Sequence, residues 1–312
     1  MARTSNKKIV TAAITGANHT PGMSPYLPIG REGIIKDAVD AFDAGAAMVH
    51  IHARQEDGHP THDKDIMFDI VSGIKKQRPN GIIAISTGGG MNMTIEQRLA
   101  AIRDFQPEMA SCNTGSMNFD LSGMVQLIEK PVYDWEIPFL EASVDNVFKN
   151  TLYDVEYCIN TMNEVGTKPE YEFFDLGQIS TIAHFLKKGI LKRPIYLQFV
   201  LGVMGGAALS VENLLYMINE AKRVFGDDIQ YSTVIGGRRQ IRYEVAMAAF
   251  GANVRVGMED SLYIRPQGEM AKSSAEQVDK ICRLLKALDF EIATSDETRE
   301  ILGLKGSENV KF

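Results

Sequence analysis

Short runs of β-branched and other apolar residues alternate along the whole chain with longer amphipathic stretches. This alternation is typical of parallel strands joined by crossover helices. We expect eight strands, at residues 9–15, 48–53, 82–87, 109–113, 171–174, 195–201, 229–235 and 253–256. Eight such units in 312 residues favour an α/β fold closed into a (β/α)8 barrel, or TIM barrel, over the alternative of an open doubly wound sheet.

Helices are expected where apolar residues recur on one helical face, at residues 31–44, 64–77 and 274–287. The unit between the fourth and fifth strands, residues 114–168, is longer than a crossover requires, and its helical pattern covers residues 143–164. We interpret this unit as an insertion that covers the mouth of the barrel or packs between subunits. Because no repeat or Pro/Ser-rich linker divides the chain, we expect one catalytic domain over residues 1–312.

Composition argues against several classes of protein. The formal net charge is -7, which gives no support for binding nucleic acid or an anionic membrane. No apolar run reaches the roughly 18 residues of a membrane-spanning helix, and we interpret the apolar stretch near the N-terminus as the first strand rather than a signal peptide. Three cysteines without a CxxC pair predict neither a disulfide framework nor a cysteine zinc site, so we expect a cytoplasmic protein.

The motif VHIHAR, residues 49–54, is the most informative segment. Residues i and i+2 of a strand point to the same face, so His50 and His52 present two imidazoles together at the end of the second strand. Barrel enzymes carry their active sites at this end of the strands. Imidazole is a good zinc ligand, and a catalytic zinc site uses about three protein ligands. The alternative is a pair of polar residues that hold no metal.

Polar residues also stand at the same end of five other predicted strands. They are Ser86 after the third strand, Ser111 and Asn113 in the fourth, Glu170 and Glu172 in the fifth, Gly237 and Arg238 after the seventh, and Arg255, Glu259 and Asp260 in or after the eighth. A carboxylate inside a barrel strand is costly unless it is paired or metal-bound. A barrel built for stability alone would not need this set, so the sequence predicts an active site at the C-terminal end.

With these segments in this order, the sequence strongly resembles the β-keto acid cleavage enzymes. The resemblance runs from TAAITGA (11–17) through VHIHAR, ISTGG, EMASCNTG (108–115), PEYEFFD and LQFVLGVMGG (197–206) to VRVGMED. It implies a zinc-dependent (β/α)8 enzyme that condenses a β-keto acid with acetyl-CoA and releases acetoacetate and a new acyl-CoA. It also implies a homo-oligomer, with a tetramer as the expected form.

Carried over by position, the resemblance implies one zinc ion per chain held by His50, His52 and Glu259. It implies that Asp260 and Arg255 act together in removing a substrate proton. Because arginine is essentially never deprotonated in proteins, we assign Asp260 as the ultimate proton acceptor and Arg255 as its electrostatic partner or relay.

The remaining site residues are expected to bind substrate. The resemblance assigns Ser86 and Ser111 to polar active-site positions and Glu172 to an acidic position near the substrate tail. Ser86 or Asn113 would donate hydrogen bonds to the oxyanion that develops during the reaction.

Two further groups of residues concern the substrate tail and CoA. Asn18 stands where the aminohexanoate enzyme of the family has an acid that faces an amine, so we expect a neutral or polar substrate tail. Gly237 and Arg238 suit the anionic groups of the substrate or of CoA. The alternative for Arg238 is that it only braces its own loop.

Two other functions compete with this interpretation. An amidohydrolase-type metal-dependent hydrolase also uses an HxH pair and an Asp after strand eight. That class places HxH on the first strand and needs histidines after strands five and six, where this chain has Phe174, Asp175 and Gly202. A non-catalytic, metal-stabilised barrel that binds a carboxylate is the second alternative, and the polar residues at six strand ends argue against it.

Overall fold

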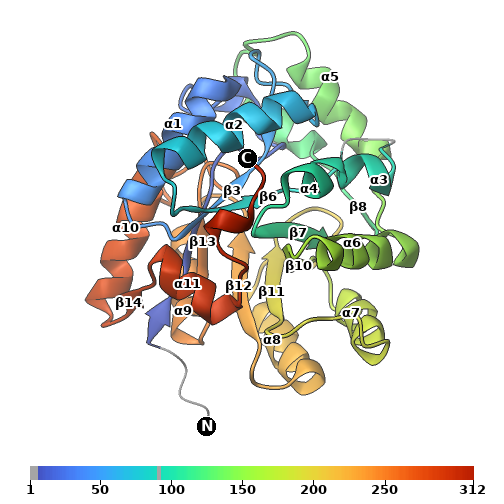
Figure 1. Cartoon of the computed structure of the whole chain (residues 1–312). Coiled ribbons are helices and arrows are strands. Elements are labelled where there is room, and N and C mark those ends of the chain that lie inside the picture. The colour runs from blue at the N-terminus through green and yellow to red at the C-terminus, as the bar shows by residue number, and fades with distance from the viewer. Residues whose placement is uncertain (1–5, 90–92) are drawn as a thin grey trace.

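The computed structural model describes residues 6–89 and 93–312. Its main sheet has eight parallel strands: β2 (Val10–Ala13), β3 (Met48–Ile51), β6 (Ile82–Ile85), β7 (Met109–Asn113), β10 (Lys168–Phe173), β11 (Tyr196–Leu201), β12 (Gln230–Ile235) and β13 (Val254–Val256). They are adjacent in the order β12-β11-β10-β7-β6-β3-β2-β13, and a parallel bridge between Ser232 and Asn253 closes the circle. This arrangement confirms the predicted (β/α)8 barrel (Figure 1).

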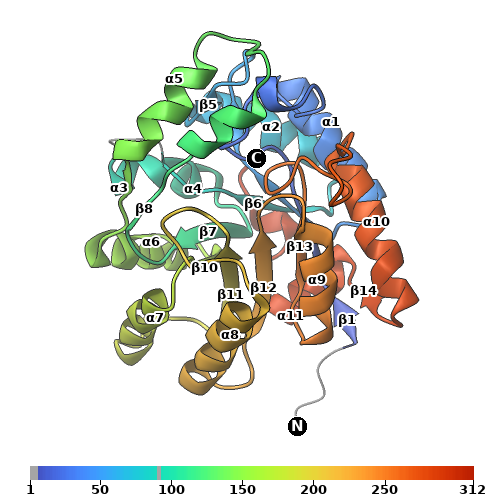
Figure 2. The ribbon, with the colours of Figure 1, turned by 180° about the vertical axis from the view of Figure 1, so that it is seen from behind.

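Helices surround the barrel, as both ribbon views show (Figures 1 and 2). They are α1 (Gly30–Asp43), α2 (Lys64–Gln77), α3 (Ile95–Arg98), α4 (Ala100–Phe105), α6 (Leu152–Glu164), α7 (Gly177–Lys187), α8 (Val211–Phe225), α9 (Gln240–Ala249) and α10 (Ser274–Ala287). The predicted bounds of α2 and α10 are correct to the residue, because each helix has an amphipathic pattern and a side-chain cap at its start, Asp63 or Ser273. None of the helices in the described part of the chain has the length and apolar character needed to cross a membrane.

The insertion contains less helix than its sequence pattern suggests. It holds β8 (Met117–Asn118), η2 (Ser122–Leu127), α5 (Glu136–Glu141), η3 (Ala142–Asp145) and β9 (Val147–Phe148) before α6 begins. The predicted helix over residues 143–164 is therefore wrong in its first nine residues. Strand β9 pairs with β8 instead, and Thr151 starts α6 through a capping box with Asp154.

The insertion packs on the loops that follow the barrel strands. The Trp135 ring lies edge-on to His59, with 4.7 Å between centroids, and a Glu136 carboxylate oxygen accepts a hydrogen bond from the Gly22 amide at 2.6 Å. His59 belongs to the hairpin of β4 (Ala53–Arg54) and β5 (Pro60–Thr61). Figure 2 shows α5 at the top, the side to which the arrowheads of β11 and β12 point. The insertion thus covers part of the C-terminal end of the barrel.

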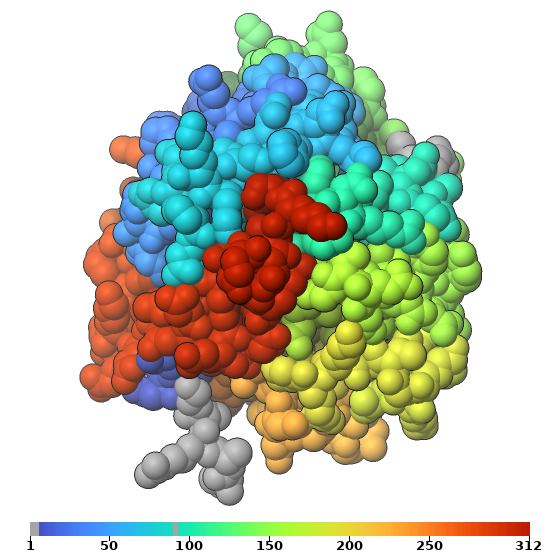
Figure 3. Space-filling view, viewed as in Figure 1, coloured from blue at the N-terminus to red at the C-terminus, as the bar shows by residue number. Residues whose placement is uncertain are grey.

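The opposite end of the barrel is closed by the C-terminal segment. Strand β14 (Glu291–Ile292) pairs with β1 (Lys7–Lys8), and α11 (Ser295–Leu302) and η4 (Ser307–Asn309) follow. Leu302 packs with Met48 and Tyr196 in one buried apolar cluster, and Arg299 forms an ion pair with Glu108 at 2.8 Å. The space-filling view shows this red segment spread across the centre of the face (Figure 3). The N-terminal half of the barrel interior is therefore filled by apolar side chains.

Candidate metal centre and active site

Two histidines and one glutamate meet inside the C-terminal end of the barrel. His50 lies on β3, His52 directly follows it, and Glu259 follows β13, which is separated from β3 only by β2. The Oε1 atom of Glu259 lies 3.7 Å from Nε2 of His50 and 3.5 Å from Nε2 of His52. Possible ligand atoms of all three residues lie within 4.8 Å of one another, so these residues can hold one metal ion.

Glycines allow the two loops that carry this cluster to approach each other. Gly16, after β2, has φ +60, and a Cβ atom there would lie 2.4 Å from Cγ of Glu259. Gly257, after β13, has φ +149, and a Cβ atom there would lie 1.9 Å from the carbonyl oxygen of Ala13. A side chain at either position would therefore displace Glu259 or the backbone that supports it.

The arginine of VHIHAR holds the loop beside the cluster. Arg54 is fully buried and donates hydrogen bonds to the carbonyl oxygens of Thr15, His19 and Gly58 at 2.9, 2.8 and 2.7 Å. The His19 ring in turn lies 2.9 Å from the carbonyl oxygen of Met258. Arg54 and His19 thus fix the loop after β2 against the turn that carries Glu259.

The protonation states of the cluster suit a divalent cation. Burial lowers the pKa of His50 to about 3, so its imidazole is neutral near pH 7. Burial alone would raise the pKa of Glu259, but Arg255, His50 and His52 hold it well below its usual range. One oxygen of Glu259, Oε2, is buried without a hydrogen-bond partner in the described part of the chain. Imidazole nitrogens and a carboxylate with a bare oxygen are the donor set that zinc takes.

Arg255 joins the cluster to Asp260. Its Nε and Nη2 atoms donate to the two carboxylate oxygens of Asp260, both at 2.9 Å, and Nη2 also donates to Oε1 of Glu259 at 2.5 Å. Burial raises the pKa of Asp260 to about 6, against the lowering effect of Arg255. Asp260 is therefore held at the border between carboxylate and acid, which suits a group that accepts and returns a proton near neutral pH.

A buried amide extends this network across the barrel. Gln198, on β11, accepts from Nη1 of Arg255 at 3.2 Å and donates to Glu170 at 2.7 Å and to Ser232 at 3.0 Å. Gln198 was not among the residues predicted from the sequence. The feature that could have identified it is a polar residue at the inward position of an apolar strand, two residues after Tyr196 and two before Val200.

Three further carboxyl groups are buried in the same region. Burial raises the pKa of Glu170 to about 7 and of Glu172 to about 8, and it raises the pKa of Glu244 well above the usual range. Glu172 pairs in register with Asn113 on β7, and both side chains are buried. The interior therefore carries Glu172 as a predominantly neutral acid near pH 7.

The two predicted serines border the cluster in different ways. The Ser86 hydroxyl accepts from the Gly88 amide at 3.1 Å, and a Cβ atom added at Gly88 would lie 3.8 Å from Cε1 of His52. The Ser111 hydroxyl accepts from the Thr87 amide at 3.0 Å, while the Thr87 hydroxyl donates to the Ser111 carbonyl at 2.8 Å. Ser111 thus braces Thr87, which lies between Ser86 and Gly88 after β6.

The other predicted residues lie at the rim. Asn18 is half-buried in the loop after β2. The Gly237 amide donates to the backbone carbonyl of Asp260 at 2.9 Å, which links its loop to the turn that carries Glu259 and Asp260. Arg238 is exposed, and its guanidinium carbon lies 4.5 Å from the centroid of the Tyr263 ring. The structure therefore leaves these residues outside the central hydrogen-bond network.

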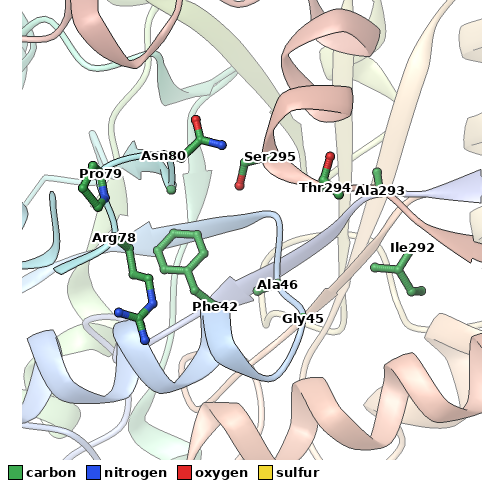
Figure 4. A pocket seen from close by; sticks show the side chains of 11 residues that line it. Phe42, Gly45, Ala46, Arg78, Pro79, Asn80, Ile292, Ala293, Thr294 and Ser295 are labelled. Atoms are coloured by element: carbon green, nitrogen blue, oxygen red, sulfur yellow. The ribbon is translucent and has the colours of Figure 1, made fainter.

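A pocket at the other end of the barrel does not have the composition of a catalytic site. It lies beside the C-terminal end of α1 and the start of α11, and Figure 4 shows Phe42, Asn80 and Ile292 among the side chains that line it. Its ionisable side chain, Arg78, forms an ion pair with Asp43. The buried carboxyl groups around Arg255, whose pKa values are shifted, lie instead at the C-terminal end, where barrel enzymes act.

Comparisons with known proteins identify the family to which the chain is similar. A sequence profile of the beta-keto acid cleavage enzyme family matches residues 7–304. A protein of Paraburkholderia graminis named 3,5-dioxohexanoate:acetyl-CoA acetone transferase is 44% identical over 99% of both chains. The 3-keto-5-aminohexanoate cleavage enzyme of Acetoanaerobium sticklandii is 35% identical over 96% of this chain and 98% of its own.

A solved structure supports the fold. The apo structure of ObcA superposes with a TM-score of 0.72 at 21% identity, covering 90% of this chain and 66% of ObcA. At that identity the likeness concerns the barrel architecture alone.

Proposed function

The chain belongs to the beta-keto acid cleavage enzyme family, and on that premise we propose that it is a zinc-dependent β-keto acid:acetyl-CoA acyltransferase. The observation that carries the proposal is the trio His50, His52 and Glu259, buried beside the Arg255–Asp260 pair. The proposed reaction converts R-CO-CH2-COO⁻ and acetyl-CoA into R-CO-CoA and acetoacetate. Atoms and charge balance in this exchange, and no oxidant or reductant is required.

The donor set fits a divalent ion, which His50, His52 and Glu259 would hold. Bound there, the ion would supply Lewis-acid stabilisation of the enolate that forms when the β-keto acid loses a C2 proton. Asp260 would accept that proton. Arg255 would remain protonated and keep Asp260 in place through its two hydrogen bonds.

The remaining steps need donors and a route for CoA. The enolate carbon would attack the thioester carbonyl of acetyl-CoA, and Ser86 or Asn113 would donate to the oxygen that becomes negative. The released CoA thiolate would then attack the C3 keto carbon, and cleavage of the C2–C3 bond would give acetoacetate and the new thioester. The exposed Arg238, on the loop tied to Asp260, would bind an anionic group of CoA or of the substrate.

A neutral substrate tail is favoured by two residues. Asn18 provides an amide rather than a charge, and Glu172 is a predominantly neutral acid that would offer a hydrogen bond rather than a counter-ion. The Paraburkholderia graminis relative is named for 3,5-dioxohexanoate, whose tail is an uncharged ketone. We propose 3,5-dioxohexanoate or a β-keto acid with a similar neutral tail as the substrate.

The experiment that tests this function is a competition among three β-keto acids, with acetyl-CoA as co-substrate. One carries a neutral tail (3,5-dioxohexanoate), one a cationic tail (3-keto-5-aminohexanoate) and one a second carboxylate. Mass spectrometry should detect the new thioester, because the total of free thiol need not change. We expect the neutral compound to give the largest kcat/KM. A tenfold preference for the cationic compound would contradict the proposed tail, and the lack of any new thioester would contradict the function.

We further propose that the protein acts as a cytoplasmic homo-oligomer, a tetramer being the expected form. The insertion and the start of α6 expose several apolar side chains, and contact with another subunit would bury them and so stabilise an oligomer. They are Val132, Val144, Val147, Leu152 and Tyr153, each exposed by 58–70%. The three cysteines are free and buried, in agreement with a reducing compartment. Light scattering of wild type and of Val147→Glu should give a larger mass for the wild type. A wild-type monomer at micromolar concentration would contradict this proposal.

A further inference from the structure

We infer that Gln198 is a positioning residue for Arg255, and that Glu170, kept as a neutral acid, supplies the acceptor that holds the nitrogen of the Gln198 amide. This inference rests on the proposed function, because it concerns the pair that would handle the substrate proton. It is carried by the hydrogen bonds that join Glu170, Gln198 and Arg255 and by the number of charges that the barrel interior can hold. Neither Gln198 nor Glu170 would touch the reacting atoms.

The hydrogen bonds of Arg255 leave one donor for a ligand. A guanidinium has five N–H groups. Nε and both hydrogens of Nη2 are directed at Asp260 and Glu259, and one hydrogen of Nη1 is directed at Gln198. The second hydrogen of Nη1 has no acceptor among the described residues. Nη1, the atom that Gln198 holds, therefore has one donor left for substrate.

The Gln198 amide can sit in only one orientation. Its oxygen accepts from Arg255, and the two hydrogens of its nitrogen go to Glu170 and Ser232. With the amide turned over, an N–H group would face the guanidinium, which has donors only. Because Gln198 is fully buried, water cannot relieve such a clash. Arg255 thus fixes the direction of the amide, and Glu170 accepts from the nitrogen that this direction turns toward it.

The charge of the interior argues that Glu170 is protonated. Five carboxyl side chains of the described structure surround Arg255: Glu170, Glu172, Glu244, Glu259 and Asp260. Arg255 is the cation that acts on Glu170, and its charge is already shared by Glu259 and Asp260. Among the described residues, Glu170 has no cation in hydrogen-bond contact; it is fully buried, and its Oε2 atom has no partner there. An ionised carboxylate there would be costly, whereas an acid keeps the acceptor that Gln198 needs.

A neighbouring group is consistent with a proton on Glu170. Tyr196 pairs in register with Glu170 on the adjacent strand, and it is fully buried. Its hydroxyl forms no well-aligned hydrogen bond with the described residues, and the Ser232 hydroxyl is its nearby polar neighbour. If Oε2 of Glu170 carries a hydrogen, Glu170 and the Tyr196 hydroxyl can form a hydrogen bond with each other. Burial of both groups without a hydrogen bond would be unfavourable.

The test compares three substitutions in the full-length, metal-loaded enzyme. Gln198→Met keeps the length of the side chain and removes the amide. Glu170→Gln mimics the neutral acid and keeps an acceptor for Gln198, whereas Glu170→Leu removes that acceptor. The matched control is Gln178→Met, since Gln178 is a buried glutamine that accepts from the Phe174 amide at 2.7 Å, away from Arg255.

We expect Gln198→Met to lower kcat about 10- to 100-fold, the size expected for a lost hydrogen bond to a charged group. KM for both substrates should stay within threefold, and metal content should be unchanged. Glu170→Gln should retain kcat within threefold, and Glu170→Leu should fall in the same direction as Gln198→Met. If Gln198→Met loses no more kcat than Gln178→Met, the positioning role is overturned.

An infrared measurement keeps the inference testable if Gln198→Met does not fold. The difference spectrum of wild type minus Glu170→Gln at about pH 6, between the ordinary pKa of 4.5 and the raised pKa of about 7, should contain the carbonyl stretch of a protonated carboxylic acid. A carboxylate signal in its place would overturn the neutral state of Glu170. This spectrum does not depend on turnover, so a wild type without thioester exchange would contradict the proposed function while leaving the state of Glu170 measurable.

Discussion

The two halves of the barrel interior are built from opposite chemistry. The N-terminal half is filled by Met48, Ile82, Tyr196 and Leu302, which pack in one apolar cluster under the C-terminal segment. The C-terminal half holds His50, Gln198 and Arg255 together with the five carboxyl groups that surround Arg255. Burial of apolar surface stabilises the first half, whereas burial of ionisable groups costs stability in the second. The comparison indicates that the polar residues of the barrel lie where a metal ion and a substrate would balance their charges.

The largest effect is expected from a substitution in the polar half. Asp260→Asn keeps the shape of the side chain and removes the proton acceptor, so kcat should fall by a factor on the order of 10² or more. Metal content and the melting temperature should change little. Exchange of the substrate C2 proton with solvent is the measurement that isolates this step. Near wild-type exchange in the variant would show that Asp260 is not the base.

A substitution in the apolar half should affect stability and leave the chemistry alone. Met48 is fully buried, and Met48→Ala should lower the free energy of unfolding by about 2–5 kcal/mol through lost burial and a cavity. Urea unfolding measures the loss, and kcat of the folded variant should match wild type. If Met48→Ala instead lowers kcat tenfold while stability is retained, the separation between the two halves is wrong.

The buried acids predict a pH-dependent stability with a definite sign. The pKa of Glu172 is about 8 in the folded protein and near its ordinary value of 4.5 in the unfolded chain. Between these two values the folded state keeps a proton that the unfolded state has lost, so the contribution of Glu172 to stability falls as pH rises and levels off above about 8. Glu172→Gln removes this dependence, and its stability relative to wild type should rise from pH 5 to pH 8.5. A difference that does not vary with pH would contradict a neutral Glu172.

The smallest effect is expected at the rim. Arg238 is exposed and screened by solvent, so Arg238→Ala should raise KM for acetyl-CoA severalfold with little change in kcat. High salt should reduce the difference between variant and wild type. Equal KM values for both substrates in variant and wild type would show that Arg238 only braces its loop against Tyr263.

The residues that sequence could predict differ from those that it could not. His50 and His52 follow from the two-residue repeat of a strand, and Glu259 and Asp260 follow from their position after the eighth strand. Gln198 could not be predicted to reach Arg255, because that contact depends on the register of β11, β12 and β13 around the closed barrel. The start of α6 was misplaced because the periodicity of residues 143–150 resembles a helix, while Thr151 and the β8–β9 pair decide the boundary.

The most direct test of the account follows the acetyl group. The enzyme is given 3,5-dioxohexanoate and acetyl-CoA that carries ¹³C in both acetyl carbons, and the products are analysed by mass spectrometry with and without a metal chelator. The account predicts that both labelled carbons enter acetoacetate, that the new acyl-CoA is unlabelled, and that the chelator abolishes the transfer. Label that stays in the thioester or is released as acetate, or transfer that the chelator leaves unchanged, would contradict it.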